Sequence, residues 1–420
     1  MVGDDIIPPR LPAGSPPGIS LSACSQSSSP FAPHWSLYPR AYVAAHTPNP
    51  ITINGDIDKP EWNSVPWSLP FDDIRGPDDA PPSERPTTRQ RTRMKMMWDE
   101  DFLYVCALIE SDFTVTAEFT DRNSPIFQKD SDFEVFLDPA GTCARYKELE
   151  LNAINTVWNL MIDKPYGDGG GEYSGRIAEP GEERYYEVYS QRTATKLVSG
   201  TLNDPDGGGA TWAVELALAH SDTLSDGTAG ESPRRGDMWR INFSRVEKRG
   251  DVNWTWQPQR IWDPVEKRVA GMVNMHLPDS WGYVVFGGPA TSEGKQGQLS
   301  LFGESPMVGD GWDATLCDIR DPSWPERIAA ANIYYAQRRF SEINGGFYAA
   351  FIFQLSDLLD ADILGPFING GGKAGVSIQL SDDKKHYVGT VTGPGGTEVT
   401  VTDSRFTTSA RTSGETTETS

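Results

Sequence analysis

The chain has 420 residues, enough for two or three domains of about 150 residues each. Its formal net charge is −22 and its isoelectric point is about 4.6. Such a charge repels phosphate backbones and anionic lipid headgroups, which argues against nucleic-acid and membrane partners. The sequence has no run of about 18 apolar residues and therefore predicts no membrane-spanning helix. The oligomeric state is not indicated by composition.

The two ends of the chain have the composition of flexible segments. Residues 1–46 are rich in proline and serine, and residues 406–420 are polar and of low complexity, so both are expected to be disordered. The first 18 residues lack the basic start and apolar run of a signal peptide, which leaves the compartment open. The four cysteines show no C-x-x-C spacing, which argues against a metal cluster, and Cys106 is expected to be a buried free thiol.

Residues 47–290 alternate short apolar segments with turn-forming clusters, a pattern typical of an antiparallel β-sandwich of jelly-roll type. In the segment SDFEVFLDP, period-two alternation directs Phe133 to the core and Glu134 to the opposite face. The same rule in this and three further segments predicts a set of core residues: Phe133, Val135, Leu137, Leu149, Leu151, Trp212, Val214, Leu216, Leu218, Trp239, Ile241 and Phe243.

The other faces of these strands carry polar side chains. If the strands are neighbours, they form a concave polar surface composed of Glu134, Glu150, Asn152, Arg240, Asn242 and Ser244. Two acids on one polar face need a compensating cation, so Arg240 is predicted to pair with Glu134 or Glu150. The tryptophans Trp158, Trp256 and Trp262 fall in or near predicted loops, where aromatic residues often contact ligands.

Residues 310–405 are predicted to form a small α+β appendage. The segment PSWPERIAAANIYYAQRRFSEINGG has apolar residues at helical spacing, and Gly345 and Gly346 are expected to end the helix. The later segment HYVGTVTGPGGTEVTVTD alternates on both sides of a PGG turn, which predicts a β-hairpin.

Seven segments, in order INGDIDKPEW, MWDEDFLYV, DSDFEVFLDP, LNAINTVWNL, WAVELALA, WRINFSRVE and LPDSWGYVVF, resemble the family 9 carbohydrate-binding modules. The resemblance covers about residues 51–287. It implies a β-sandwich that binds the ends of oligo- or polysaccharides and accompanies secreted enzymes of polysaccharide breakdown. It also implies an extracellular setting, and structural calcium in some members.

In that family two tryptophans hold a sugar ring, helped by glutamate, arginine, glutamine and asparagine side chains. The resemblance places Phe127 near the first tryptophan and Glu134 at the glutamate. Glu150 takes the arginine position and Ser244 the glutamine position, while Met275, beside His276, takes that of the second tryptophan. The chain thus keeps two features of the family's site. The full candidate carbohydrate-binding set is Phe127, Glu134, Glu150, Asn152, Trp158, Arg240, Ser244, Trp256, Trp262 and Met275.

Non-catalytic carbohydrate binding is therefore the favoured hypothesis, and no catalytic residue is assigned. One alternative is hydrolysis of O-glycosyl bonds by Glu134 and Glu150, because glycosidases use two carboxyl groups. A second is haem-based electron transfer, with Met94, Met96 or Met97 and His276 as iron ligands. No cofactor is expected beyond structural calcium, for which the available oxygen donors are Asp56, Asp58, Asp130 and Asp132.

Overall fold

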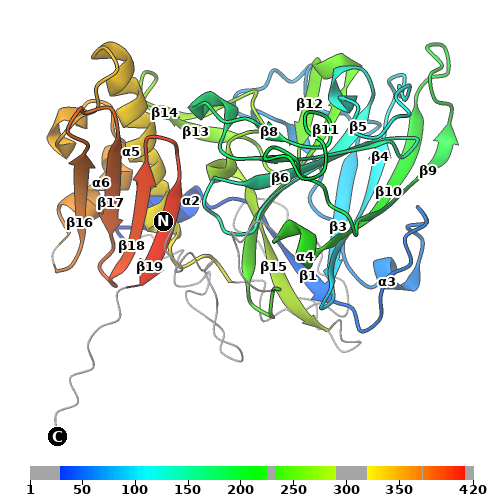
Figure 1. The fold of residues 1–420 in the computed structure, drawn as a ribbon, viewed down its shortest axis with the longest axis horizontal. Helices are drawn as coiled ribbons and strands as arrows, with labels where there is room; N and C mark the ends of the chain where they lie inside the picture. The colour runs from blue at the N-terminus through cyan, green and yellow to red at the C-terminus, as the bar shows by residue number, and fades with distance from the viewer. Residues whose placement is uncertain (1–28, 225–231, 290–318, 371, 412–420) are drawn as a thin grey trace, which may run out of the picture.

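The computed structural model describes residues 29–224, 232–289, 319–370 and 372–411 (Figure 1). The chain is mainly β, and the expected β-sandwich is confirmed. Its main sheet follows the path β8-β7-β6-β5-β11-β15-β1-β3-β4-β10-β9, with β12 attached to β11 and β2 attached to β12. Its strands are β1 (Ala41–His46), β2 (Asp72–Asp73), β3 (Thr92–Trp98), β4 (Phe102–Glu110), β5 (Asp132–Asp138), β6 (Tyr146–Asn152), β7 (Val157–Ile162), β8 (Glu172–Tyr173), β9 (Arg192–Gly200), β10 (Ala210–Ala219), β11 (Met238–Glu247), β12 (Val252–Thr255) and β15 (Gly282–Pro289).

Short helical segments connect these strands. The α-helical ones are α2 (Ala32–Ser36), α3 (Pro60–Asn63) and α4 (His220–Thr223). The 3-10 turns are η1 (Ile126–Gln128), η2 (Tyr166–Asp168), η3 (Lys248–Gly250) and η4 (Pro278–Ser280). A separate two-stranded ribbon consists of β13 (Arg260–Asp263) and β14 (Arg268–Gly271).

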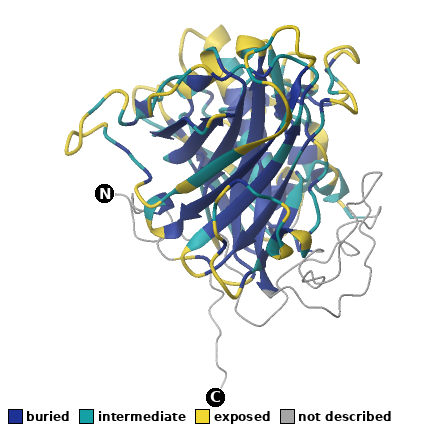
Figure 2. Cartoon of the chain, turned by 90° about the vertical axis from the view of Figure 1, so that its right-hand side faces the viewer, coloured by how far each residue is buried: buried dark blue, intermediate teal, exposed yellow. Residues whose placement is uncertain are grey.

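The main core lies between the two halves of the curled sheet. Phe133 from β5 stacks on Phe243 from β11, with ring centroids 5.9 Å apart, and Trp212 from β10 belongs to the same apolar cluster. Every core residue predicted from strand alternation is buried there. Figure 2 shows buried strands and exposed residues concentrated in the connecting loops. The expectation for Cys106 is also confirmed, because its thiol is free and buried.

Strand β1 corrects the expected N-terminal boundary. Residues 41–46 were expected to be disordered, yet they form a buried strand. The strand pairs in parallel with both β15 and β3, whereas the other paired strands of the main sheet are antiparallel. The apolar segment AYVAA had enough hydrophobic surface for a central strand, but its partners are remote in sequence. Residues 1–28 lie outside the described part of the chain.

The C-terminal part packs a helix against a second sheet. Helix α5 (Trp324–Ile343) ends before Gly345 and Gly346, as expected, and is followed by η5 (Ile352–Leu355) and α6 (Ala361–Ile368). The expected hairpin is β17–β18, the centre of a four-stranded antiparallel sheet. The strands are β16 (Gly375–Leu380), β17 (Tyr387–Thr392), β18 (Thr397–Thr402) and β19 (Thr407–Arg411). Residues 407–411 are therefore ordered, contrary to expectation, and 412–420 lie outside the description.

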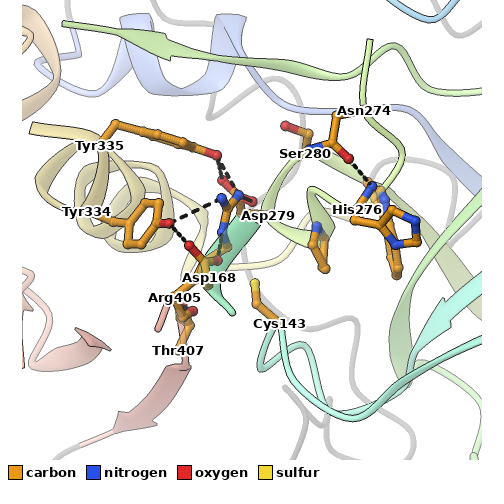
Figure 3. Close-up of polar contacts among 12 residues, drawn as sticks. Cys143, Asp168, Asn274, His276, Asp279, Ser280, Tyr334, Tyr335, Arg405 and Thr407 are labelled. Carbon is orange, nitrogen blue, oxygen red and sulfur yellow. Dashed lines mark hydrogen bonds and ion pairs between the residues drawn. The ribbon is translucent and has the colours of Figure 1, made fainter. Parts of the chain in front are cut away.

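A buried arginine joins the C-terminal part to the sandwich (Figure 3). Arg405, in the turn between β18 and β19, forms ion pairs with Asp168 at 3.0 Å and Asp279 at 2.6 Å. The same guanidinium donates hydrogen bonds to the hydroxyls of Tyr334 and Tyr335 on α5. Since the two aspartates belong to the sandwich and the tyrosines to the helix, one side chain ties the two parts together.

None of the helices in the described residues has the length and hydropathy needed to cross a bilayer.

Candidate functional site

The outer face of β5, β6, β7 and β11 brings together much of the predicted site. Strand pairing places Glu134 opposite Glu150 on one side and Ser244 on the other. Asp132 lies opposite Asn152, and Glu150 lies opposite Trp158. Because the strands are antiparallel neighbours, these side chains project from the face that looks away from the main core.

The face is covered, which corrects the expectation of an open polar surface. Glu134 is 4% exposed and Glu150 is 1% exposed. A second apolar cluster lies over the strands, in which Ile126 of η1 and Met275 pack beside Trp158. Alternation along a strand assigns a side chain to a face, but it carries no information about a loop that folds over that face.

Four carboxyl groups are concentrated under this cover. Burial raises the pKa of Glu134 to about 7, a rise that the Ser244 hydroxyl opposes. Burial, and then the Glu134 charge, raise the pKa values of Asp132, Glu148 and Glu150 well above their usual range. Glu148 was absent from the predicted set, although period two places it on the same face as Glu150.

Arg240 does not compensate these acids, so its predicted pairing with Glu134 or Glu150 is wrong. Its guanidinium donates hydrogen bonds to the backbone carbonyls of Pro278 and Asp279, and it stacks 4.4 Å from the ring centroid of Tyr283. The register explains the difference: in the pairing of β11 with β5, Ser244 faces Glu134, whereas Arg240, four residues earlier, faces Asp138.

Asn152 holds the local turn together. Its amide nitrogen donates to the Phe119 carbonyl at 2.9 Å and to Asp130 at 2.7 Å. Its side-chain oxygen accepts from the backbone N–H groups of Ile154 and Thr156. Asp130 also accepts the N–H groups of residues 118 and 119, so its oxygens are already engaged.

Aromatic rings reach the surface beside the buried acids, together with Arg176, whose partner Glu172 is buried. Phe127 is 37% exposed and stacks on Trp158, with centroids 6.2 Å apart and an interplanar angle of 13°. The Arg176 guanidinium lies 5.2 Å from the Trp158 ring centroid and pairs with Glu172. Tyr166 is 43% exposed and stands edge-on to His276 at 4.6 Å. We call Phe127, Tyr166, Glu172 and Arg176 the rim.

Three rim residues had not been predicted from the sequence. Tyr166 precedes the glycine-rich segment DGGGE, and a bulky aromatic beside a flexible turn is the only local signal for it. Glu172 and Arg176 are four residues apart in a short strand and the turn after it, so neither belongs to a periodic segment. Their proximity to Phe127 depends on strand pairings that single-sequence patterns do not encode.

Two of the predicted tryptophans lie away from this face. Trp256 is in the main core, edge-on to Phe243 with centroids 6.0 Å apart, and not in an exposed loop where it could contact a ligand. Trp262 is on β13, and its indole N–H donates to the Leu358 carbonyl at 2.7 Å. It packs against the C-terminal part instead of the polar face.

The residues of the two alternative activities are not arranged for those activities. Met94, Met96 and Met97 belong to the main core, whereas His276 contacts Phe136 and Tyr166 on the outer face. Haem ligation by such a pair would need them to face each other across one plane. Glu134 and Glu150 are under the covering loops, so a glycosidic bond does not reach them in this conformation.

Comparisons with known proteins find low similarity. No family model and no curated protein matches the chain. A protein of Bacteroides uniformis, described as a candidate carbohydrate-binding protein, is 14% identical, with 59% of this chain and 99% of that one covered and a TM-score of 0.42.

Two solved structures of a family 9 carbohydrate-binding module from Caldicellulosiruptor kristjanssonii are also similar. The complex with cellotriose is 18% identical, covering 62% of this chain and 100% of the module, with a TM-score of 0.35. The complex with glucose is 19% identical, covering 59% and 96%, with a TM-score of 0.34. At these values the likeness carries no functional argument, and the function must be argued from this chain's own residues.

Proposed function

We propose that the chain binds saccharides, without catalysis, at the rim. The observation that carries the proposal is the exposure of two aromatic rings, Phe127 and Tyr166, beside the Glu172–Arg176 ion pair. Sugar rings present C–H faces that pack on aromatic planes and hydroxyls that hydrogen-bond to carboxylates and guanidinium groups. The rim supplies both kinds of contact in one place.

The ring of Phe127 is held in place by the residues beneath it. One face of its ring rests on Trp158, and its backbone N–H donates to Glu150 at 3.3 Å. Trp158 itself contacts both the Phe127 ring and the Arg176 guanidinium. A ring that is already ordered loses little entropy when a ligand stacks on it, which favours binding. Each contact is modest, so a single site is expected to bind with roughly micromolar to millimolar affinity.

The test is a glycan array followed by calorimetry on wild type and variants. Phe127→Ala and Tyr166→Ala should each weaken binding by about 1 to 3 kcal/mol, because each removes a stacking plane. The matched control is Phe353→Ala: this ring is 70% exposed and stacks on Phe351 in the C-terminal part, away from the rim. Unchanged affinity for the glycan in both rim variants would contradict the proposed site. Loss of affinity in Phe353→Ala alone would place the saccharide site in the C-terminal part.

The finer proposal is an accessory role in polysaccharide breakdown, the setting implied by the family resemblance. A polysaccharide hydrolase fused to this chain should release more soluble sugar from insoluble substrate than the same fusion carrying Phe127→Ala. Equal release by the two fusions would contradict an accessory role, even if the isolated chain binds sugar.

A further inference from the structure

The covered face holds more carboxyl oxygens than its hydrogen bonds account for. Asp132, Glu134 and Glu150 each contribute a carboxylate oxygen, and these atoms all lie within 4.8 Å of one another. All three side chains are buried. They come from two strands paired in register, so their spacing is fixed by the sheet and not by a mobile loop.

Two carboxylate oxygens in and around this group have no donor. Asp132 Oδ1 accepts the Val246 N–H at 2.9 Å, but Asp132 Oδ2 has no hydrogen-bond partner. Glu148, a fourth buried acid beside the three, interacts with Glu150 and also leaves its Oε2 without a partner. An unpartnered buried carboxylate oxygen carries a desolvation cost that a bound ligand would remove.

Basic side chains do not balance the charge. In the part of the chain that the structure describes, no lysine or arginine forms an ion pair with Asp132, Glu134, Glu148 or Glu150. Arg245, a buried arginine on β11, pairs with Glu247 and donates to Thr92 and to backbone carbonyls. A positive ligand of small size would pair these acids in so small a volume.

We propose that Asp132, Glu134 and Glu150 bind one divalent metal ion, with calcium as the cation that fits best. Oxygens at about 2.3 to 2.6 Å from a calcium ion lie at most about 5 Å apart, which the separation of these atoms satisfies. Calcium accepts six to eight oxygens in flexible geometry, so water would complete its shell. The inference goes beyond saccharide binding and does not depend on it.

The bound ion would also support the rim. Glu150 accepts the backbone N–H of Phe127, and its carboxylate is one of the three ligands. Fixing that carboxylate fixes the turn that carries the aromatic platform. The metal would thus stabilise both strands and the turn above them.

The experiment measures metal binding and thermal unfolding without sugar. The whole chain is stripped with EDTA and titrated with Tb³⁺, whose emission is sensitised by nearby indoles such as Trp158, and then with Ca²⁺ as competitor. The variants Asp132→Asn and Glu134→Gln each remove one ligand charge and keep the side-chain shape. Glu183→Gln, at an exposed glutamate, removes the same charge elsewhere and is the matched control.

Wild type and Glu183→Gln should bind one ion, and Asp132→Asn and Glu134→Gln should bind it at least about tenfold more weakly. Calcium should raise the melting temperature of wild type but hardly that of Glu134→Gln. In EDTA at pH 8 the order should reverse, with Glu134→Gln melting higher, because it lacks one uncompensated buried charge. If the variants are folded in EDTA, their weaker metal binding reflects the lost ligand and not misfolding.

Equal Ca²⁺ affinity in wild type and both ligand variants would overturn the proposal and assign the binding to surface acids. A melting temperature of wild type that is the same in Ca²⁺ and in EDTA would overturn it as well, and would mean that the four acids share protons instead. If sugar binding depends on Phe127 while Ca²⁺ has no effect, only the metal site fails. Loss of sugar binding with an intact metal response would reject only the proposed function.

Discussion

The indole of Trp256 closes one side of the main core. It is 1% exposed, lies edge-on to Phe243, and packs against the backbone of Gly282. A Cβ atom at Gly282 would come within 2.5 Å of the Trp256 ring, which explains why glycine occupies that position. The absence of a side chain at Gly282 thus makes room for the indole of Trp256.

Trp256→Ala is expected to lower the free energy of unfolding by about 3 to 5 kcal/mol, because it leaves a cavity where the indole was. Guanidinium-induced unfolding, followed by circular dichroism, measures the change. Phe351→Ala, at an exposed ring, should change stability by no more than about 0.5 kcal/mol. A cost below about 1 kcal/mol for the tryptophan variant would mean that its side chain is not part of the core.

At the residue scale, alternation was sufficient to separate the two sides of a strand. Phe133 and Val135 enter the main core and Glu134 faces away, as predicted. The same pattern could not reveal that Ile126 and Met275 would cover Glu134, because covering residues come from loops without periodicity. The identity of a face is local information, whereas its exposure is a property of the folded chain.

At the scale of elements, the short helix α2 shows how the N-terminal region is anchored. His34 on this helix is buried, and its Nε2 lies 2.8 Å from the Ile363 carbonyl on α6. The backbone carbonyl of His34 accepts the indole N–H of Trp324 at the start of α5. Helices α2, α5 and α6 thus meet at one histidine residue.

This imidazole predicts a dependence of stability on pH. Burial lowers the pKa of His34 from 6.5 to about 4. The unfolded chain therefore takes up a proton between pH 6.5 and 4 that the folded chain does not. Stability from this group is complete above pH 6.5 and declines as the pH falls towards 4.

His34→Gln keeps a donor for Ile363 and removes the titration. Between pH 7 and pH 4.5, wild type should lose up to about 3 kcal/mol more stability than the variant. Urea unfolding at the two pH values gives the difference. His386→Gln, at an imidazole that is 70% exposed, serves as the control and should behave like wild type. Parallel losses in wild type and His34→Gln would contradict a neutral buried His34.

Element boundaries and pairings were predictable to different degrees. The helix that ends before Gly345 and the hairpin at the PGG turn follow from local signals, and both are present. The register of β11 does not, and it alone decides that Ser244 instead of Arg240 faces Glu134. Strand register depends on the whole sheet. Ion pairs between strands therefore cannot be predicted from the sequence of the individual strands.

At the scale of the whole molecule, Arg405 holds the C-terminal part on the sandwich. Its side chain is buried, and its two aspartate partners, Asp168 and Asp279, are also shielded from solvent. Removing one partner of a buried ion pair leaves the other charge buried without compensation. The resulting loss of folding free energy is larger than the net stabilisation that the intact pair provides.

Arg405→Met should therefore lower the free energy of unfolding by about 3 to 5 kcal/mol. The C-terminal part should also separate first, giving an early step in calorimetry and early cleavage near residue 319 in limited proteolysis. Arg339→Ala, which breaks the exposed pair with Glu342, should cost at most about 1 kcal/mol. A single transition at an unchanged temperature would show that the arginine does not hold the two parts together.

The parallel pairing of β1 has a consequence for how the protein is made. Ala41 pairs with Tyr283, so the first strand of the sheet finds one neighbour only after nearly the whole sandwich has been synthesised. Its other neighbour, β3, is available much earlier. Contacts between such distant residues slow folding. On the ribosome, the apolar segment AYVAA therefore stays paired on one side only until β15 emerges, and it must be protected from aggregation during that time. Pairing of β15 with β1 is then the step that completes the sandwich.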